Sequence, residues 1–335
     1  MSSYTESTLE EMSKVIVTSI TARDVRFHTS QDSSGSDAVS PDPEYSCTYV
    51  TIQVDRDGVP APDLTGTAIA FSIGRGNEII KQLVDVIGTK VVGLKLSQWV
   101  TNFAAVWRRI TVDGQLKWIG PDKGPAHQAS SPLVNALWDV WAKYEKKPVW
   151  ELVVDLSPEH LLTCLDFRYV RDVLDEEEAL ALLKKCAVGK ERRKEDAKQR
   201  GYPSYTTSTG WLGYSDDKVR KLCKESLDAG MDAFKMKVGV SLEDDAKRAA
   251  LMRECIGWDC KLMMDANAIW GVREAIDNMT SLSQFNPYWI EEPTCPDDVL
   301  GHATIQKALD PFAINVRVFF VLLVNNNICH DKIIF

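Results

Sequence analysis

The chain has 335 residues, of which 44% are hydrophobic and 26% charged, a composition typical of a globular protein whose length favours two domains over one. Its net charge of -9 would repel phosphate backbones and anionic lipid, so neither nucleic acid nor a membrane surface is an expected partner. The 8 cysteines include no Cys-x-x-Cys pair, which argues against a zinc site and against a dense disulfide framework.

The N-terminal segment is acidic. Its first 14 residues contain three glutamates and one lysine, unlike a secretory signal or an arginine-rich transit peptide. The longest late apolar run, 318–324, has seven residues, whereas a span across a bilayer needs about 20. We therefore expect a cytoplasmic protein, with mitochondria as the alternative location.

Two strands are predicted near the N-terminus. Residues 15–27 and 47–54 alternate apolar with polar side chains and are rich in valine and threonine. The segment between them, 31–43, is crowded with Ser, Asp, Gly and Pro, which predicts a mobile loop.

Two helical regions complete an α+β domain over residues 1–150. Apolar residues recur at helical spacing over 77–107 and 131–144, and Pro132 is placed to start the second helix. Just before the first region, the segment 74–77 (Gly-Arg-Gly-Asn) could cradle a phosphate. Capping of the following helix is the simpler prediction, because the dinucleotide-binding fingerprint is absent.

The second half of the chain alternates helices and strands. Charged residues 175–200 indicate a helix with a solvated face, and residues 204–208 indicate a first strand. Two further helices each have a serine N-cap, acids in the first turn and a closing glycine, namely Ser215 with Gly230 and Ser241 with Gly257.

Three later segments each predict a short strand that ends in charged residues, at 234–239, 263–267 and 289–293. From Lys237 to Asp265 is 28 residues and from Asp265 to Glu291 is 26, enough for one strand, one helix and two loops each time. This alternation implies parallel strands whose carboxyl ends gather at one face. The predicted fold class is α/β, with an N-terminal α+β domain and then an incomplete (β/α) TIM-type barrel over 151–313.

Side chains at these strand ends predict a magnesium site. Strand parity points Lys235 and Lys237 to the barrel interior, together with Asp265, Asn267 and Glu291. The two carboxylates offer the hard oxygen ligands that Mg²⁺ prefers. Two ammonium groups ~7 Å apart at an effective dielectric of about 20 repel by about 2 kcal/mol. We expect this repulsion to lower the pKa of one lysine, so that it can act as a general base.

Two other readings of the same side chains stay open. The lysines and acids could form structural ion pairs that close the fold. Lys235 or Lys237 could also form a Schiff base, as in an aldolase, although that function leaves the paired acids unexplained.

Several segments together resemble one family: 113–121 (DGQLKWIGP), 211–217 (WLGYSDD), the Lys-x-Lys pair, Asp265-Ala266-Asn267 and Ile290-Glu291-Glu292-Pro293. With these motifs the chain resembles, over about residues 14–312, the enolase superfamily. Within it, the mandelate racemase and muconate lactonizing-like subgroup is the most similar, and especially its sugar-acid dehydratases of the L-fuconate dehydratase type. Sites of this superfamily combine a Lys or His base with Mg²⁺. The resemblance implies a Mg²⁺-dependent hydro-lyase that acts on a small-molecule sugar acid, and it leaves a homo-oligomer open.

By this resemblance, Lys237 is the acid/base lysine and Lys235 contacts the substrate carboxylate. Asp265 and Glu291 are the first two Mg²⁺ ligands, and Asn267 is a further substrate contact. The N-terminal domain becomes a capping domain, which selects the sugar acid through four residues of its loop: Gly35, Ser36, Asp37 and Tyr45. A lid of this kind would exclude water and strengthen the polar contacts inside the closed site.

The sequence departs from the family near its C-terminal end. The family's third ligand is a Glu expected 29 residues beyond Glu291, where this chain has Phe320. The later His-Asp pair, whose histidine would protonate the departing 3-hydroxyl, is absent as well. Residues 314–335 are therefore predicted to be a divergent tail. The alternative to an active dehydratase is a truncated chain that is inactive or only binds a ligand, with an open strand edge.

Overall fold

The computed structural model describes residues 4–119 and 124–317. They form two compact units. Unit 1 contains the residues up to Phe27 together with Tyr45–Gly201, and unit 2 contains His28–Glu44 together with the residues from Tyr202 onward. The predicted loop thus leaves unit 1, belongs to unit 2 and returns, so the chain passes between the units three times.

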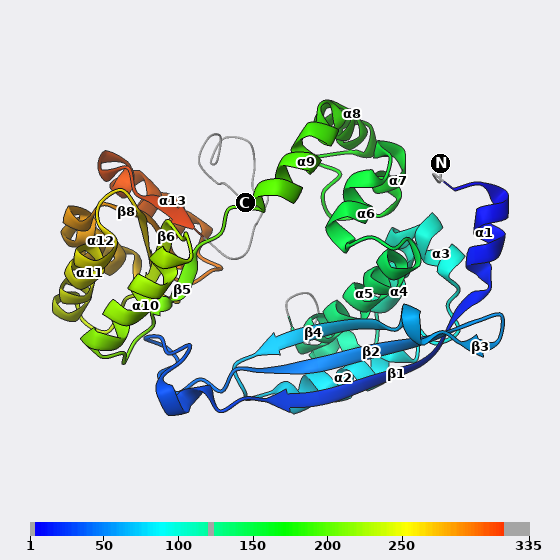
Figure 1. The fold of residues 1–335 in the computed structure, drawn as a ribbon, viewed down its shortest axis with the longest axis horizontal. Coiled ribbons are helices and arrows are strands. Elements are labelled where there is room, and N and C mark those ends of the chain that lie inside the picture. Colours follow the sequence, from blue (N-terminus) through cyan, green and yellow to red (C-terminus); the bar gives the residue numbers. More distant parts are fainter. Residues whose placement is uncertain (1–3, 120–123, 318–335) are drawn as a thin grey trace. The chain divides into compact units, whose positions relative to one another are not determined.

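The sheet of unit 1 is antiparallel, and its long second strand pairs with each of the other strands (Figure 1). The strands are β1 (Val15–Arg26), β2 (Ser46–Arg56), β3 (Val59–Pro60) and β4 (Gly66–Ser72). Alternate residues of β2 are buried, as expected for a sheet with one covered face. The strands predicted at 15–27 and 47–54 are confirmed.

Helices cover the buried face of this sheet, with α2 against β1 and α5 against β4 and β2 (Figure 1). The helices of unit 1 are α1 (Glu6–Ser13), α2 (Asn77–Gly88), α3 (Leu96–Thr101), α4 (Phe103–Thr111), α5 (Pro125–Tyr144), α6 (Val149–Asp155), α7 (Pro158–Thr163), α8 (Glu176–Ala187) and α9 (Lys190–Arg200). One hydrophobic cluster joins sheet and helices, and its largest fully enclosed side chains include Trp99, Trp141, Leu133 and Ile52.

Two sequence-based expectations for unit 1 need correction. Helix α5 begins at Pro125, and Pro132, predicted to start it, lies inside the helix. Pro125 fits the first turn of a helix because the N–H groups of that turn have no partner within the helix. The helix therefore begins more than one turn before Pro132. The single helix predicted over 175–200 is divided into α8 and α9, because Gly189 adopts a left-handed φ of 70°.

Residues 151–201 lie in unit 1, although the sequence placed the start of the barrel at residue 151. Helix α6 contacts α5, α9 contacts α6, and α7 contacts α8. The boundary between the two compact units therefore lies after Gly201 and not after residue 150.

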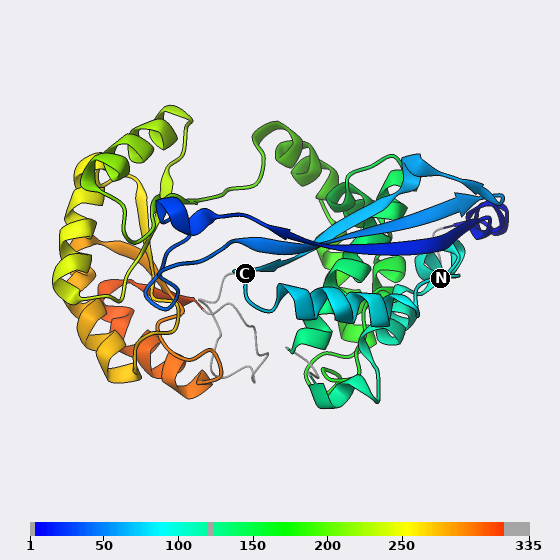
Figure 2. The same ribbon diagram turned by 90° about the horizontal axis from the view of Figure 1, so that it is seen from below.

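Unit 2 is a parallel sheet in the order β5-β6-β7-β8-β9. Its strands are β5 (Thr206–Gly210), β6 (Ala233–Lys237), β7 (Lys261–Asp265), β8 (Pro287–Glu291) and β9 (Asn315–Arg317), and its helices are α10 (Asp216–Asp228), α11 (Leu242–Ile256), α12 (Val272–Leu282) and α13 (Val299–Leu309). Figure 2 shows these helices in an arc outside the strands. The α/β fold class with a partial barrel is confirmed over the described residues.

Local signals set the helices and faces of unit 2 as predicted. The Ser215 hydroxyl accepts a hydrogen bond from the Lys218 N–H, and the Ser241 hydroxyl accepts one from the Asp244 N–H. The residues that alternate with the two lysines, on β6 and directly after it, lie in one buried cluster with the helices: Phe234, Met236 and Val238. Lys235 and Lys237 therefore face the interior of the curved sheet.

Short 3-10 turns occur at Thr29–Asp32, Pro62–Leu64, Leu116–Ile119, Ser283–Phe285 and Asp310–Phe312. No helix in the described part of the chain is long and apolar enough to cross a membrane. Of the predicted tail 314–335, the structure describes only the residues up to Arg317, which include β9. Phe320 lies outside the described residues.

Candidate functional site

The carboxyl ends of three neighbouring strands carry a cluster of charged side chains. Lys237 of β6 is in register with Asp265 of β7, and Asp265 is in register with Glu291 of β8. Parallel pairing therefore aligns residues that are far apart in sequence at one edge of the sheet. The lysine two residues before, Lys235, shares the face of Lys237.

Two buried lysines bind the two carboxylates in one network. The Lys235 ammonium lies 2.9 Å from Asp265 Oδ2 and 2.7 Å from Glu291 Oε1. The Lys237 ammonium lies 2.7 Å from the same Asp265 oxygen and donates to Asn267 Oδ1 at 2.7 Å. The side chains of Lys235 and Asp265 are only 6% and 2% exposed, so their charges depend on one another for stabilisation.

The backbone next to this cluster is unusual. Asn267, Ala268 and Glu292 all have a left-handed φ, between 46° and 61°. The Ala268 N–H donates to the Glu292 carbonyl at 2.7 Å, and the Asn267 N–H donates to Asp265 Oδ1 at 3.0 Å. Left-handed residues other than glycine concentrate at functional sites, which supports a functional assignment for these strand ends.

The electrostatics of the lysines differ from the sequence-based expectation. Burial alone would lower the pKa of Lys235, but the charges of Asp265 and Glu291 outweigh it and raise that pKa above its ordinary value. Burial likewise opposes ionisation of Asp265, but Lys235 and Lys237 outweigh it and lower its pKa. The prediction that repulsion between the lysines dominates is therefore wrong for Lys235, because that argument left out the two carboxylates, which lie 2.9 and 2.7 Å from its ammonium.

The donor set fits a small divalent cation. Asp265 and Glu291 already direct one oxygen each at a single positive group, the Lys235 ammonium. Mg²⁺ commonly binds through one or two carboxylates and completes its six positions with water and substrate. No group of three His, Cys, Asp or Glu side chains with metal-binding geometry occurs among residues 4–119 and 124–317.

The loop 28–44 rests against the same end of the unit 2 sheet. It meets the segment that follows β5 through three hydrogen bonds: Leu212 N–H to the Ser36 carbonyl (3.1 Å), Ser34 hydroxyl with Tyr214 hydroxyl (3.2 Å) and Lys218 ammonium to the Asp32 carbonyl (2.9 Å). It also lies beside the segment that follows β6, since a β-carbon added at Gly239 would be 3.3 Å from Ala38 Cβ. The structure thus brings this loop and the lysine strand to one edge of the sheet.

Within the loop, the predicted substrate contacts hold its turns. Gly35 has a left-handed φ of 86°, and the buried Ser36 hydroxyl donates to the Pro41 carbonyl at 2.8 Å. Asp37 Oδ1 accepts from the N–H groups of Val39 and Ser40. Their polar groups therefore order the loop, and a direct substrate contact stays a prediction.

Tyr45 belongs to unit 1, unlike the other predicted loop residues. Its ring packs edge to face against Phe71, with centroids 5.1 Å apart. Its role also stays a prediction.

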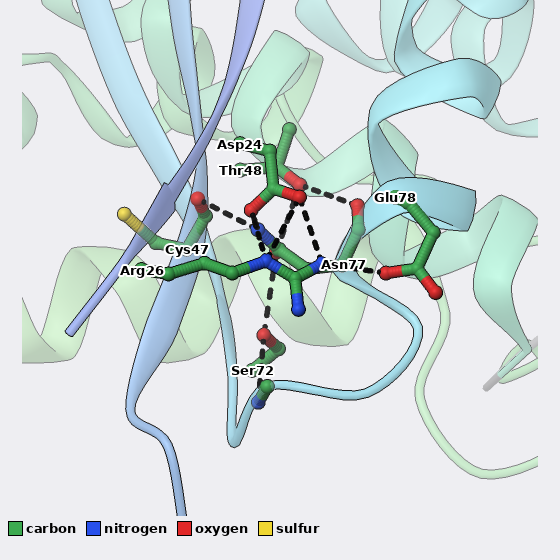
Figure 3. A network of polar contacts seen from close by, with 8 residues as sticks. Asp24, Arg26, Cys47, Thr48, Ser72, Asn77 and Glu78 are labelled. Carbon is green, nitrogen blue, oxygen red and sulfur yellow. Dashed lines mark hydrogen bonds and ion pairs between the residues drawn. The ribbon is translucent and has the colours of Figure 1, made fainter. Parts of the chain in front are cut away.

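A polar network fixes the strand ends from which the loop departs (Figure 3). The fully buried Asn77 amide donates to Asp24 Oδ1 and to the Cys47 carbonyl, and its oxygen accepts from Thr48 and Ser72. Gly76, with a left-handed φ of 85°, is the N-cap of α2, in agreement with the capping interpretation of this segment. Since Asp24 lies near the end of β1 and Cys47 near the start of β2, both ends of the loop start from a fixed backbone.

Sequence reasoning missed an aromatic residue beside the lysines. The Lys235 ammonium lies 5.1 Å from the centre of the Tyr205 ring, which packs edge to face on Trp289. Tyr205 precedes β5, and the five-residue strand carries only weak periodicity, so no signal in the sequence aimed this side chain inward.

Comparisons with known proteins show which family this chain resembles in sequence and in fold. A family model described as Enolase C-terminal domain-like matches residues 218–318. Mitochondrial enolase superfamily member 1 of Homo sapiens is 46% identical over 320 residues, which is 95% of this chain and 70% of the human protein. This chain belongs to the enolase superfamily.

Other members agree in sequence and in fold. The crystal structure of the human protein superposes with a TM-score of 0.87, covering 92% of this chain and 69% of that one. L-galactonate dehydratase of Hypocrea jecorina is 44% identical over 327 residues, 97% of this chain and 70% of its own length. L-talarate/galactarate dehydratase from Salmonella typhimurium LT2, liganded with Mg and L-lyxarohydroxamate, has the same fold at 24% identity, with a TM-score of 0.62 over 92% of this chain and 66% of that one.

Proposed function

We propose that this enolase-superfamily member is a Mg²⁺-dependent dehydratase of a sugar acid, of the L-fuconate dehydratase type. The observation that carries the proposal is the network in which Lys235, Lys237, Asp265 and Glu291 converge at three aligned strand ends. Two relatives that cover this chain almost completely bear the names Mitochondrial enolase superfamily member 1 and L-galactonate dehydratase, which supports a sugar acid as substrate.

In the proposed reaction, Lys237 removes the proton at C2 of the acid, and its ammonium then keeps that proton. Lys235 lies one pleat below and contacts the substrate carboxylate as a fixed positive charge. Asp265 and Glu291 would hold Mg²⁺, which supplies positive charge against the negative charge that develops on the substrate carboxylate. The 3-hydroxyl leaves as water with a proton taken from the solvent, and Lys237 then returns its own proton to the solvent. The enol that remains loses its hydroxyl proton as C3 takes one up, which gives a 2-keto-3-deoxy acid.

The loop 28–44 supports selection of the acid. Gly35, Ser36 and Asp37 lie on the part of the loop that rests on Leu212 and neighbours Gly239. Leu212 follows β5, and Gly239 follows β6, the strand that ends at Lys237. We assign substrate contacts to these residues, to Tyr45 and to Asn267. An ordered loop at this edge would also reduce the access of water to the reacting carbon.

The test is turnover by the full chain on L-fuconate, L-galactonate and galactarate, with formation of the 2-keto-3-deoxy acid as the readout. Activity should require Mg²⁺, vanish in EDTA and fall about 100- to 10,000-fold in Lys237→Met, since that is the range of general acid–base contributions. The Lys237→Met protein should still bind Mg²⁺, because Asp265 and Glu291 remain. Turnover that persists in EDTA, or full activity in Lys237→Met, would refute the proposal.

A second candidate is a chain that binds Mg²⁺ and a sugar acid without turnover. It is favoured by one observation, that the described residues offer two carboxylates but no third ligand from His, Cys, Asp or Glu. Calorimetric titration with Mg²⁺ and L-fuconate distinguishes the two candidates, because this one predicts saturable binding with no product. A Schiff-base aldolase has less support, since it leaves the paired acids Asp265 and Glu291 without a role. Trapping with borohydride and a keto acid would reveal it.

A further inference from the structure

Helix α11 carries a partly buried arginine that binds the backbone of the lysine strand. Arg248 Nη1 donates to the Lys237 carbonyl at 2.5 Å, and Nη2 donates to the carbonyls of Gly210 at 2.8 Å and Trp211 at 3.2 Å. One guanidinium therefore joins the carboxyl ends of β5 and β6. Charged donors make hydrogen bonds about twice as strong as neutral ones, so these contacts hold backbone atoms firmly.

The same helix binds the other side of Lys237 through an acid. Asp245 is 1% exposed, and its Oδ2 accepts from the Gly239 N–H at 2.8 Å. Gly239 has a φ of 114°, a conformation that side chains disfavour, and a β-carbon there would lie 2.6 Å from Ile269. Asp245 thus fixes a tightly enclosed backbone turn two residues after Lys237.

We infer that Asp245 and Arg248 are positioning residues, which hold the backbone on both sides of Lys237 so that its amine is aligned with the substrate carbon. They are three residues apart, so one face of α11 presents both side chains to the end of β6. This inference rests on the proposed function for the role of Lys237. It adds two residues that bind only backbone groups here and contact neither the charged side chains of the network nor the proposed metal ligands.

Arg248 also connects the lysine to the loop. Its contact with the Trp211 carbonyl holds the start of the segment in which the Leu212 N–H binds the Ser36 carbonyl. A shift of the guanidinium would therefore move both the base and the surface on which the loop rests. A displacement of about 1 Å can lower a rate about 100-fold, which makes such a support functionally important.

The helix contains a matched control, Arg253. Arg253 is buried, and its guanidinium donates to four backbone carbonyls, those of Gly257, Cys260, Phe285 and Asn286. These carbonyls precede β7 and β8, at the opposite end of the strands from the lysines. Replacing Arg253 removes contacts of the same kind, but it leaves the backbone at Lys237 supported.

The experiment compares Arg248→Met, Arg248→Lys and Arg253→Met in the full chain. Arg248→Met should lose about 100-fold in kcat, with the Kd for Mg²⁺ unchanged, because Asp265 and Glu291 stand on strands that Arg248 does not contact. Arg248→Lys should recover part of the loss, since an ammonium reaches fewer carbonyls. Arg253→Met should lower the unfolding temperature at least as much but keep the wild-type kcat.

Hydrogen exchange provides a readout that does not require turnover. Arg248→Met should accelerate amide exchange in residues 210–214 and 238–240, and Arg253→Met should do so only in 257–261 and 285–287. If the wild-type chain shows no dehydration, the proposed function fails while this exchange pattern still decides whether the backbone is held as described. The inference is overturned by unchanged exchange near Lys237 in Arg248→Met, or by equal losses of kcat in Arg248→Met and Arg253→Met.

Discussion

At the scale of the residue, Asp265 connects the whole charged cluster. Both lysines bind its Oδ2, and its other oxygen accepts from the Asn267 N–H. A carboxylate this buried is stable only because its neighbours compensate its charge, and the reverse holds for the lysines. Function and folding therefore depend on the same atoms at this position.

The first prediction concerns stability without metal. Asp265→Ala should lower the free energy of unfolding by about 3–5 kcal/mol, because two ammonium groups lose their shared partner in a buried place. Denaturation with urea in EDTA measures this change. The control is Asp277→Ala, which removes an exposed ion pair with Arg273 and should cost less than about 1 kcal/mol. Equal small costs in both variants would contradict the compensation argument.

The second prediction concerns pH. Burial raises the pKa of Asp245 from 3.8 to about 6. Because the folded state holds this proton more tightly, ionisation destabilises the fold. The penalty is absent below pH 3.8, grows from about pH 4 to pH 6 and is complete above that, at an amount on the order of 3 kcal/mol.

Asp245→Asn cannot ionise but retains an oxygen that can accept from the Gly239 N–H. Its stability relative to wild type should therefore rise between about pH 4 and pH 6 and then stay level. Urea denaturation of both proteins at several pH values provides the measurement. A stability difference that is independent of pH would show that the carboxyl group does not titrate in this range.

Sequence alone located the charged residues but not their electrostatics. Parity on a short strand is enough to place Lys235 and Lys237 on one face, and the structure bears this out. Their distances to Asp265 and Glu291 depend on the register of three strands, which no local pattern specifies. The sequence-based argument therefore overestimates the effect of the repulsion between the two lysines on the pKa of Lys235. The sequence does not mark Asp245 and Arg248 as functional residues, because a charged pair on a helix usually indicates a solvated face.

At the scale of the element, β5 and β6 meet unusually closely at Gly210. A β-carbon there would lie 2.5 Å from the Lys235 carbonyl oxygen and 2.5 Å from Met236 Cα. Both are backbone atoms, which cannot move aside as a side-chain end would. Glycine is thus required for the two strands to approach where Arg248 joins them.

The third prediction follows from this contact. Gly210→Ala should lower the free energy of unfolding by about 1–3 kcal/mol, because the added methyl group forces the two strands apart. Thermal unfolding gives the measurement, with Gly114→Ala as control, since no atom lies within 4 Å of a β-carbon at Gly114. A Gly210→Ala protein as stable as wild type would mean that the strands separate without cost.

Elements with strong local signals were predictable, and those set by packing were not. Ser215 and Ser241 cap their helices as expected, because a capping hydroxyl acts within one turn. The start of α5 was misplaced, because two prolines compete for the first turn and only Pro125 takes it. Residues 151–201 were assigned to the barrel, since their helical pattern does not reveal which unit their apolar faces contact.

At the scale of the whole molecule, each unit has its own hydrophobic cluster. One cluster includes Trp99 and Trp141 in unit 1, and the other includes Phe234 and Met236 in unit 2. All the proposed metal ligands and both lysines belong to unit 2. Stabilisation by a bound metal should therefore act on one unit.

The fourth prediction is a selective effect of Mg²⁺ on unfolding. At 100 times its Kd, a ligand that binds only the folded state adds about 2.7 kcal/mol of stability. Calorimetry should show an unfolding transition of unit 2 that moves upward with Mg²⁺, while that of unit 1 stays in place. Ca²⁺-free buffer with EDTA and a Glu291→Gln variant serve as controls, and neither should show the shift. Equal shifts of both transitions would contradict a site confined to unit 2.

The division of the chain into units could not be foreseen in full. The composition of residues 31–43 correctly indicated a loop between two strands, but its docking depends on partners such as Tyr214, which is 180 residues from Ser34. Contacts over such separations leave no periodic trace in the sequence. The spacing of residues does not predict a capping role for the loop. Only the resemblance to the enolase superfamily predicts it.

The placement of this loop has a consequence for biosynthesis. Residues 28–44 leave the ribosome early, yet the surface that receives them, from Leu212 to Lys218, is made more than 160 residues later. In a nascent chain, the hydrogen-bonding groups of this loop therefore lack their partners in unit 2 while β1 and β2 already pair, because domains fold in the order of their synthesis. Ordering of the loop on unit 2 therefore cannot precede synthesis of the segment that follows β5.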